Sequence, residues 1–307
     1  MKRATKETLY FETGRDNEVT LEVEPGEAFE VETQMNRGPW LGDHPDGARL
    51  KSKLVGGNPS SGCIRVVGAE PGDTLVCKIE TIDPGPVGFT RFMGSTDAMP
   101  SRLGASALGD ISRIVRIVDR KILWSDELSL DIRPMLGFIG VAPASERHHN
   151  GWAGYWGGNF DIQELTDGAT LYLPVFVPGA LLHVGDMHAI QGDGEICGAG
   201  GIETEGIARL NCDLIKGVAL DYPRIENNTH LIAMAMERPA EDAFRSALER
   251  LIGWLASDYE MAPADAYLLL GQVLEARCTQ YVNPTYSYVA KIAKRYLPDP
   301  SFRGVRN

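Results

Sequence analysis

Residues 157–205 read GGNFDIQELTDGATLYLPVFVPGALLHVGDMHAIQGDGEICGAGGIETE, and the rest of the chain is best understood from this stretch. Asp186 and His188 are two positions apart, as are Asp193 and Glu195. In an extended chain, residues two apart project from the same face. Residues 189–192 separate the two pairs, and Gly194 lies inside the second pair. This glycine-containing segment favours a tight turn of the chain. The stretch therefore predicts two acid-bearing strand ends that face one another across a turn.

A metal ion of hard or borderline character, or a water molecule held between acids, suits such an arrangement. A β-hairpin whose turn is merely acidic has the same spacing. The pattern alone leaves both interpretations open.

Composition limits the function classes. The chain has 307 residues, with 30 Lys and Arg against 42 Asp and Glu, so its net charge is -12. This charge disfavours nucleic acid as a partner. The first residues lack the apolar run of a signal peptide or membrane span, and five cysteines are scattered without a CxxC pair. We therefore expect a soluble, cytoplasmic protein that makes no membrane contact.

The N-terminal part has the alternation of β-strands. Residues 19–23 and 29–33 alternate apolar and polar residues around Pro25-Gly26, which predicts a hairpin of half-buried strands. Short apolar runs between glycine-rich turns follow up to residue 82, as in a β-sandwich or barrel. Residues 83–110 are rich in Pro and Gly, and we interpret them as a functional loop or lid.

The C-terminal part has helical periodicity. Apolar residues from Ala243 to Leu255 recur at helical spacing behind Pro239, and a second stripe runs from Pro263 to Arg277, including Tyr267. Both stripes predict core-facing amphipathic helices. The expected fold is thus mostly β, with a sandwich-like or barrel-like core and an α+β C-terminal part carrying two late helices. We divide it into residues 1–150 and residues 151–307, which carry the catalytic stretch, or else one intertwined domain.

Histidines outside the central stretch fall in predicted loops. His44 follows Asp43 beside a proline, and His148 and His149 are adjacent, so that at most one of these two faces a given ion. Loop histidines are more often solvated than ligating. The nearby Trp152, Tyr155 and Trp156 could line a pocket or belong to the core.

Several segments resemble the acetamidase/formamidase family of amide hydrolases. The resemblance rests on GGNFDIQEL, GATLYLPVFVPGALLHVGDMH and QGDGEICGAGGIE, with GAEPGDTL, RPMLGFIGVAPA, DAYLLLGQ and QYVNPTYSYVAKI in the family's order. It implies hydrolysis of a small amide such as formamide or acetamide to a carboxylate and ammonia, with lactams as substrates of related members. It also implies a mostly β fold with a late helical pair, metal ions in some members, and a homo-oligomer.

The sequence departs from this pattern near Glu32. Many relatives carry an acid where this chain has Gln34 and Asn36. We hypothesise that Asp43 or His44 supplies the ligand that this acid provides elsewhere.

Amide hydrolysis requires an activated nucleophile, a polarised carbonyl and a proton for the leaving nitrogen. We hypothesise that Asp161, Asp186 and His188 ligate a divalent metal, Zn²⁺ and/or Ca²⁺, and that Glu195 is the general base and later the acid. Asp193 would orient Glu195 or ligate the metal.

Two other function classes remain. One is a catalytically silent binding or assembly protein on the same scaffold. The other is an oxidative metal enzyme, which would want more histidines than this acid-rich stretch offers.

Overall fold

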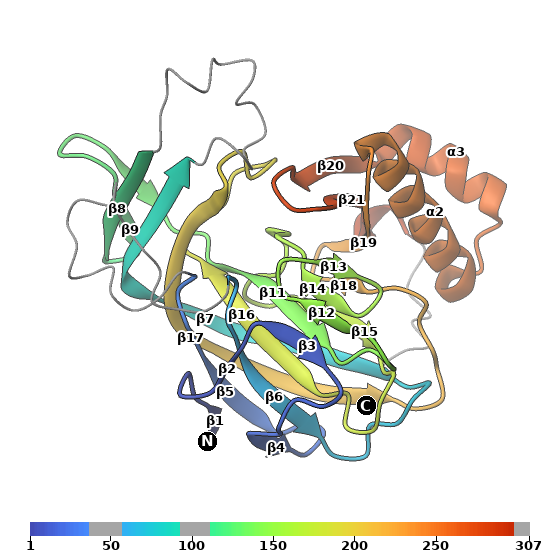
Figure 1. The fold of residues 1–307 in the computed structure, drawn as a ribbon. Helices are drawn as coiled ribbons and strands as arrows, with labels where there is room; N and C mark the ends of the chain where they lie inside the picture. Colours follow the sequence, from blue (N-terminus) through green and yellow to red (C-terminus); the bar gives the residue numbers. More distant parts are fainter. Residues whose placement is uncertain (37–56, 93–110, 298–307) are drawn as a thin grey trace.

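The computed structural model describes residues 1–36, 57–92 and 111–297. Its architecture is mostly β, as predicted, with a large curled sheet and a helical pair near the C-terminus (Figure 1). The N-terminal strands are β1 (Lys2–Ala4), β2 (Leu9–Tyr10), β3 (Glu12–Gly14), β4 (Leu21–Val23), β5 (Ala28–Thr33), β6 (Ser60–Val66), β7 (Thr74–Phe92), β8 (Ile111–Val118), β9 (Lys121–Leu123), β10 (Ser129–Asp131), β11 (Met135–Val141) and β12 (Arg147–His149).

The later elements include the site-bearing strands. They are β13 (Ala153–Gly154), β14 (Gly157–Asn159), β15 (Thr170–Pro174), β16 (Leu182–His188), β17 (Ala199–Ile215), β18 (Arg224–Glu226), β19 (His230–Glu237), α2 (Ala240–Tyr259), α3 (Pro263–Val273), β20 (Glu275–Gln280), β21 (Tyr286–Ala293) and the short 3₁₀ helix η3 (Lys294–Tyr296). Within the described residues, hydrogen bonds join 19 of these strands into one network, and β3 and β12 form a separate pair.

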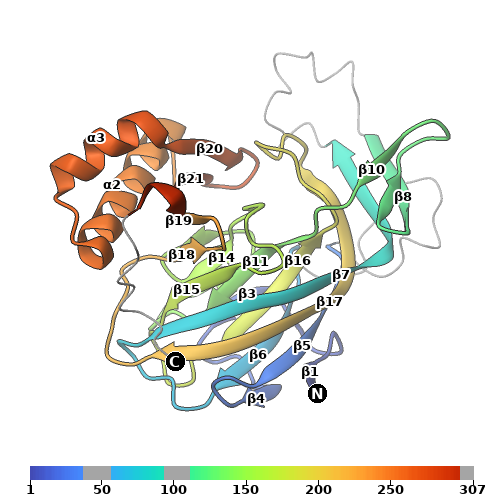
Figure 2. The same cartoon turned by 180° about the vertical axis from the view of Figure 1, so that it is seen from behind.

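Two long antiparallel strands form the spine of the sheet. β7 and β17 run side by side across the molecule (Figure 2), and β17 also pairs with β5 and β16. The main core lies inside the curl, where large apolar side chains such as Phe29, Ile64, Leu75, Ile139 and Leu173 are buried. Strands from either side of residue 150 pair directly, including β11 with β16 and β7 with β17. The division of the chain at that residue stays a prediction.

The helical pair packs on one end of the sheet. Ala243, Ala247, Leu251, Trp254 and Leu255 form the buried stripe of α2, which lies against β19 and β21. Both predicted helices are therefore confirmed. The second is shorter than predicted, because α3 ends at Val273 and Arg277 lies in β20. Tyr267 was also wrongly predicted to face the core, since it is 61% exposed.

Two predictions for the N-terminal part were wrong. β4 and β5 do form around Pro25-Gly26, but not as a hairpin: β4 pairs in parallel with β6, while β5 pairs with β1 and β17. The segment 83–92 is not a loop, because β7 continues to Phe92. Prolines lack an N–H and are tolerated in strands at irregular positions, and the β7–β17 register shifts between Thr204 and Gly206, beside Pro84. The rest of the predicted lid, residues 93–110, lies outside the described residues.

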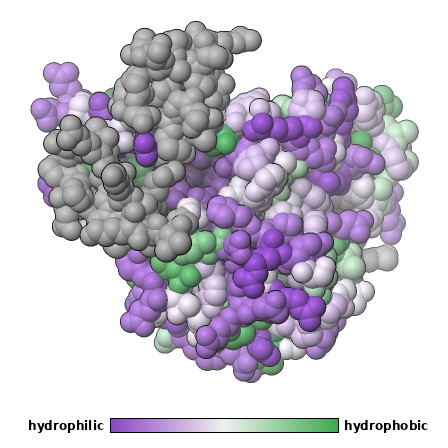
Figure 3. Space-filling view, viewed as in Figure 1, coloured by the Kyte–Doolittle hydropathy of each residue, from purple (hydrophilic) through white to green (hydrophobic). Residues whose placement is uncertain are grey.

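The surface suits the charge of the chain. Over the described part of the face in Figure 3, hydrophilic residues predominate and apolar ones form small patches. In the described residues, no helix combines the length and apolar character needed to cross a bilayer.

Candidate active site

Four acids of the central stretch and His188 gather around the β16–β17 hairpin. Asp186 and His188 lie in β16, and Glu203 in β17 stands directly opposite His188. Asp161 follows β14, and Glu195 lies in the turn between β16 and β17. The predicted turn between acid-bearing segments is present, but the acid on the facing strand is Glu203 rather than Asp193 or Glu195.

The cluster is tight and buried. Ligand atoms of Asp161, Asp186 and His188 lie within 4.8 Å of one another. Nε2 of His188 lies 3.6 Å from Oδ1 of Asp186 and 3.5 Å from Oε2 of Glu203. All of these side chains, with Glu195, are at most 6% exposed. The three ligands predicted from the sequence are thus brought together.

A neighbouring amide fixes the orientation of His188. The side-chain nitrogen of Gln191 donates to the backbone carbonyls of Asp161 and Thr279, so its Oε1 is the atom that faces His188. Nδ1 of His188 lies 2.9 Å from that Oε1 and must donate its proton to it. Nε2 then presents its lone pair to the carboxylates, which is the arrangement of a metal-ligating histidine.

Buried acceptor atoms without partners converge on this place. Among the described residues, none of the following atoms has a hydrogen-bond partner: Asn159 Oδ1, Asp161 Oδ1, Asp186 Oδ1, His188 Nε2, Glu195 Oε2 and Glu203 Oε2. Each such orphaned group costs free energy unless something compensates it. Because carboxylate oxygens and an imidazole nitrogen are all acceptors, the compensating species must donate hydrogen bonds or carry positive charge, as a water molecule, a bound proton or a cation does.

The crowding of acids also changes their protonation. Burial and the neighbouring charge of Asp186 raise the pKa of Asp161 to about 8. Burial and the charge of Asp161 raise the pKa of Glu195 well above its usual range. For His188, burial lowers the pKa, but the charges of Glu203 and Asp186 outweigh it and raise this pKa well above its ordinary value. The cluster therefore binds positive charge strongly.

The backbone makes room for the cluster. A Cβ on Gly137 would lie 2.5 Å from Oδ1 of Asp161 and 2.6 Å from Oδ2 of Asp186, so a side chain there would displace both carboxylates. Asp161, Asp186 and Glu195 adopt positive φ angles of 48°, 52° and 42°. Non-glycine residues rarely adopt this conformation, and it concentrates at functional sites.

The C-terminal hairpin β20–β21 completes the site. Nδ2 of Asn283 donates to Oδ2 of Asp161 at 2.6 Å. Gln280 shapes the loop that carries Asn283, because its Oε1 accepts from the backbone N–H groups of Val282 and Asn283. The loop also contacts the β16–β17 turn, where the Tyr281 N–H donates to the Gly194 carbonyl.

Asp193 and His44 are not part of the described cluster. The side chain of Asp193 is 68% exposed and forms an ion pair with Arg277, at 2.8 Å from its Nε. The two terminal nitrogens of Arg277 also donate to the two carboxylate oxygens of Glu164, at 2.8 and 2.7 Å. Asp193 thus helps to anchor the turn that carries Glu195. His44 lies outside the described residues.

A second buried histidine, His183, is held by hydrogen bonds to its neighbours and has, in the part of the chain that the structure describes, no partner that would make it catalytic. Asn17 donates to the backbone carbonyl of Glu12 and accepts from Arg147, so its Nδ2 faces Nε2 of His183. The remaining nitrogen of His183, Nδ1, donates to Oγ of the fully buried Ser60. Burial, together with the charge of Arg147, lowers the pKa of His183 to about 3. This histidine cannot take a proton from the serine, so the pair does not form a nucleophilic site.

The adjacent histidines His148 and His149 lie in β12 rather than in the predicted loop, and they face opposite sides, as expected of neighbours in a strand. The ring of His148 stacks on Trp156, with centroids 3.6 Å apart. His149 and Trp152 line the cavity above the acid cluster, which has a volume of about 310 Å³. Trp156 belongs to the core at 6% exposure, whereas Trp152 is a pocket residue.

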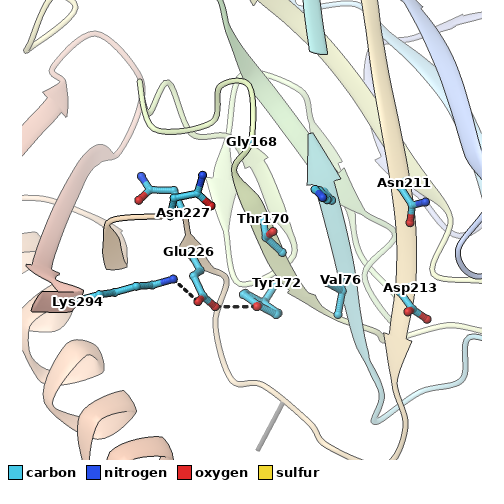
Figure 4. A pocket seen from close by; sticks show the side chains of 11 residues that line it. Val76, Gly168, Thr170, Tyr172, Asn211, Asp213, Glu226, Asn227 and Lys294 are labelled. Atoms are coloured by element: carbon cyan, nitrogen blue, oxygen red, sulfur yellow. Dashed lines mark hydrogen bonds and ion pairs between the residues drawn. The ribbon is translucent and has the colours of Figure 1, made fainter. Parts of the chain in front are cut away.

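A larger hollow of about 400 Å³ lies beside β15, β17 and β18 (Figure 4). Glu226 is held by two lining residues: Lys294 contacts its Oε1 at 2.5 Å, and the Tyr172 hydroxyl donates to its Oε2 at 2.9 Å. None of the orphaned atoms lines it. The smaller cavity is therefore the candidate active site.

Three residues of this site were missed from the sequence: Glu203, Gln191 and Asn283. Glu203 carried a usable signal, since Glu203 and Glu205 are two positions apart, like the two pairs singled out earlier in the same stretch. Gln191 lies in the predicted turn, and Asn283 comes from a distant hairpin, so neither had a local signal.

Known proteins resemble the chain both in sequence and in structure. The model of the acetamidase/formamidase family matches residues 153–294. The acetamidase of Mycolicibacterium smegmatis is 52% identical over 61 residues, which are 20% of this chain and 15% of that protein. That matched segment is thus well under two thirds of the curated relative's length.

Solved structures match over almost the whole chain. The acetamidase of Bacillus halodurans is 29% identical, with a TM-score of 0.88 over 96% of this chain and 98% of that one. The acetamidase of Yersinia enterocolitica is 31% identical, with a TM-score of 0.87 over 97% of this chain and 93% of that one. On this full-length likeness, the chain belongs to the acetamidase/formamidase family.

Proposed function

We propose that this protein hydrolyses a small primary amide to a carboxylate and ammonia. The observation that carries the proposal is the group of buried, unpartnered acceptor atoms of Asp186, Glu195 and Glu203 at the floor of one cavity. Unpartnered atoms of Asp161 and His188 belong to the same cluster, beside Asp186. Family membership and the names of the relatives, acetamidase and formamidase, support the same chemistry.

The donor set fits a divalent cation. Asp161, Asp186 and His188 would hold it, since the three side chains are close together and buried, and each offers one unpartnered atom: Oδ1 of Asp161, Oδ1 of Asp186 and Nε2 of His188. Carboxylate oxygens with one imidazole nitrogen suit Zn²⁺, and a carboxylate-rich set also suits Ca²⁺. When bound there, the cation would polarise the amide carbonyl and lower the pKa of a nearby water.

Glu195 is the proposed general base. Its carboxylate lines the cavity, and its Oε2 is free of hydrogen-bond partners among the described residues. The raised pKa of this buried carboxyl, caused by burial and the charge of Asp161, brings it toward the range in which a group both accepts and returns a proton. Glu195 takes the proton as water adds to the amide carbon, and returns it to nitrogen as the C–N bond breaks.

Other residues hold this machinery in place. Gln191 orients His188, and Asn283 donates to Asp161. Asp193 is proposed as a positioning residue, acting through its ion pair with Arg277 on the turn that carries Glu195. We also propose a cytoplasmic homo-oligomer.

The test measures ammonia release from formamide and acetamide, and formation of the ring-opened amino acid from a γ-lactam, by metal-loaded protein. Glu195→Gln should lower kcat by roughly 10²–10⁴-fold, the usual share of a general acid–base group, while the metal content stays the same. Glu205→Gln is the matched control, because this acid of the same stretch pairs with Lys6 outside the cavity.

Retained turnover in Glu195→Gln would remove the proposed role of Glu195. Ring opening of the lactam, with no ammonia released from either linear amide, would favour a lactam hydrolase. Absence of hydrolysis of all three substrates, by a protein that binds metal, would favour a catalytically silent binding protein.

A further inference from the structure

The cavity above the acid cluster changes character from floor to mouth. Its floor carries Asp186, Glu195 and Glu203, which are 2%, 6% and 3% exposed. Its mouth carries Trp152, which is 45% exposed, and the exposed Pro284, with the half-buried Val282 beside it. A substrate bound with its amide at the acids would therefore meet apolar surface with its other end.

This apolar wall is fixed relative to the acids. The backbone of Trp152 donates to the His149 carbonyl and accepts from the Asn159 N–H, two residues before Asp161. Val282 precedes Asn283, whose side chain contacts Asp161, and its N–H is held by Gln280. Hydrogen bonds thus hold Trp152 and Val282, the two sides of the wall, close to Asp161. This fixed position is typical of a preformed binding subsite.

Further exposed apolar side chains lie next to the site. Ile196, at 59% exposure, and Tyr281, at 38%, both come within 3.4 Å of where a Cβ on Gly194 would lie. Exposed apolar side chains that gather at a cavity usually mark a binding surface. Ile196 follows Glu195 directly, so the rim continues beside the proposed base.

The volume of the cavity points the same way. A water molecule, with one heavy atom, occupies about 30 Å³ in the liquid. At this volume for each heavy atom, the four heavy atoms of acetamide occupy about 120 Å³. The cavity measures about 310 Å³. An acyl group larger than acetyl has room to reach the apolar mouth.

We infer that the preferred substrates are primary amides whose acyl group is apolar and longer than acetyl, and that Trp152, Val282 and Pro284 select them. This inference rests on the proposed amide hydrolysis. The acyl chain extends from the acid floor along the apolar wall, and each buried methylene favours the longer substrate.

The test compares formamide, acetamide, propionamide and butyramide, first by ammonia release and then by calorimetric binding to the same metal-loaded protein. Burying one methylene changes an equilibrium about fourfold, so we expect kcat/KM to rise about tenfold or more from acetamide to butyramide. Trp152→Ala should reduce the ratio of kcat/KM for butyramide over formamide by about tenfold. Tyr267→Ala removes an exposed aromatic on α3 that does not line this cavity, and should leave that ratio unchanged.

A series in which kcat/KM falls from formamide to butyramide, with a ratio unaffected by Trp152→Ala, would overturn the inference while leaving amide hydrolysis intact. If no amide is hydrolysed, the proposed function fails and the binding series decides the inference separately. Tighter binding of butyramide than of acetamide, weakened in Trp152→Ala, would then support the apolar subsite. Equal binding of the four amides would reject it.

Discussion

Nδ1 of His188 lies 2.9 Å from Oε1 of Gln191, and this contact leaves Nε2 of His188 facing the acids. The amide of Gln191 cannot turn over without losing two hydrogen bonds to backbone carbonyls. One side chain thus couples the orientation of the histidine to the backbone at Asp161 and β20.

Replacing Gln191 by Leu should weaken metal binding without removing a ligand. Outer partners of ligating histidines typically contribute 10–100-fold to metal affinity, so we expect a loss of that size for Zn²⁺. A competitive titration against a coloured chelator measures it. Gln272→Leu, at an exposed position of α3, should keep the wild-type affinity. An unchanged affinity in Gln191→Leu would mean that His188 is not a ligand.

Asp186→Asn should abolish stabilisation by metal, whereas Asp193→Asn should retain it. The first change removes a buried ligand, while Asp193 is exposed and paired with Arg277. At a free metal concentration of about a hundred times Kd, binding to the folded state adds about 2.7 kcal/mol of stability. The rise in Tm on adding metal to chelator-treated protein measures this. A rise in Asp186→Asn equal to that of the wild type would place the metal elsewhere.

Gly137→Ala should displace the carboxylates of Asp161 and Asp186. Its new methyl would lie within 2.6 Å of carboxylate oxygens of Asp161 and Asp186, so we expect destabilisation of about 1–3 kcal/mol and loss of metal. Gly253→Ala in α2 is the control, and its effect on the free energy of unfolding should have the opposite sign, since nothing lies within 4 Å of its added methyl. There a helical alanine should stabilise by about 0.5–1 kcal/mol. Urea unfolding measures both, and equal stabilities would contradict this close approach.

Glu164 should make stability depend on pH in the acid range. Burial raises its pKa, but hydrogen bonds and charges from Arg277 and Lys291 outweigh burial and lower the pKa below its usual value. A lowered folded-state pKa stabilises the protein above the unfolded-state pKa, and this stability is lost as pH falls through the folded-state pKa.

Glu164→Gln should therefore cost about 2 kcal/mol at pH 7. The difference from wild type should narrow as pH falls below about 4. Urea unfolding at several pH values measures it, with the exposed Glu249→Gln expected to stay within about 0.5 kcal/mol throughout. A difference that is constant with pH would show that the charge of Glu164 does not contribute.

Local periodicity was enough to predict part of this site. Alternation placed Asp186 and His188 on one strand face, and the glycine-rich turn after them is real. The facing acid could not be read off in the same way, because the turn spans residues 189–198 and therefore contains both Asp193 and Glu195. Only the register of β17 shows that Glu203 is the residue opposite His188.

Strand partners were likewise beyond the local pattern. The alternation around Pro25-Gly26 correctly predicted two strands, but a tight turn between them suggested a hairpin that the long-range pairing of β5 with β17 replaces. At Pro84 and Pro86, proline content suggested a loop, whereas an irregular position of the β7–β17 ladder accommodates them. The helices were easier to predict, because their apolar stripes depend on spacing within one segment.

The contacts of Asn283 and Thr279 with the centre also bear on biosynthesis. Asp161 and Gln191 are made more than eighty residues before these two partners leave the ribosome. A nascent chain therefore carries a crowded group of acids whose supporting donors do not yet exist. The acid cluster can gain its full set of contacts only after synthesis has passed the last hairpin, so premature termination within the helices would yield a protein that lacks β20, β21 and a finished centre.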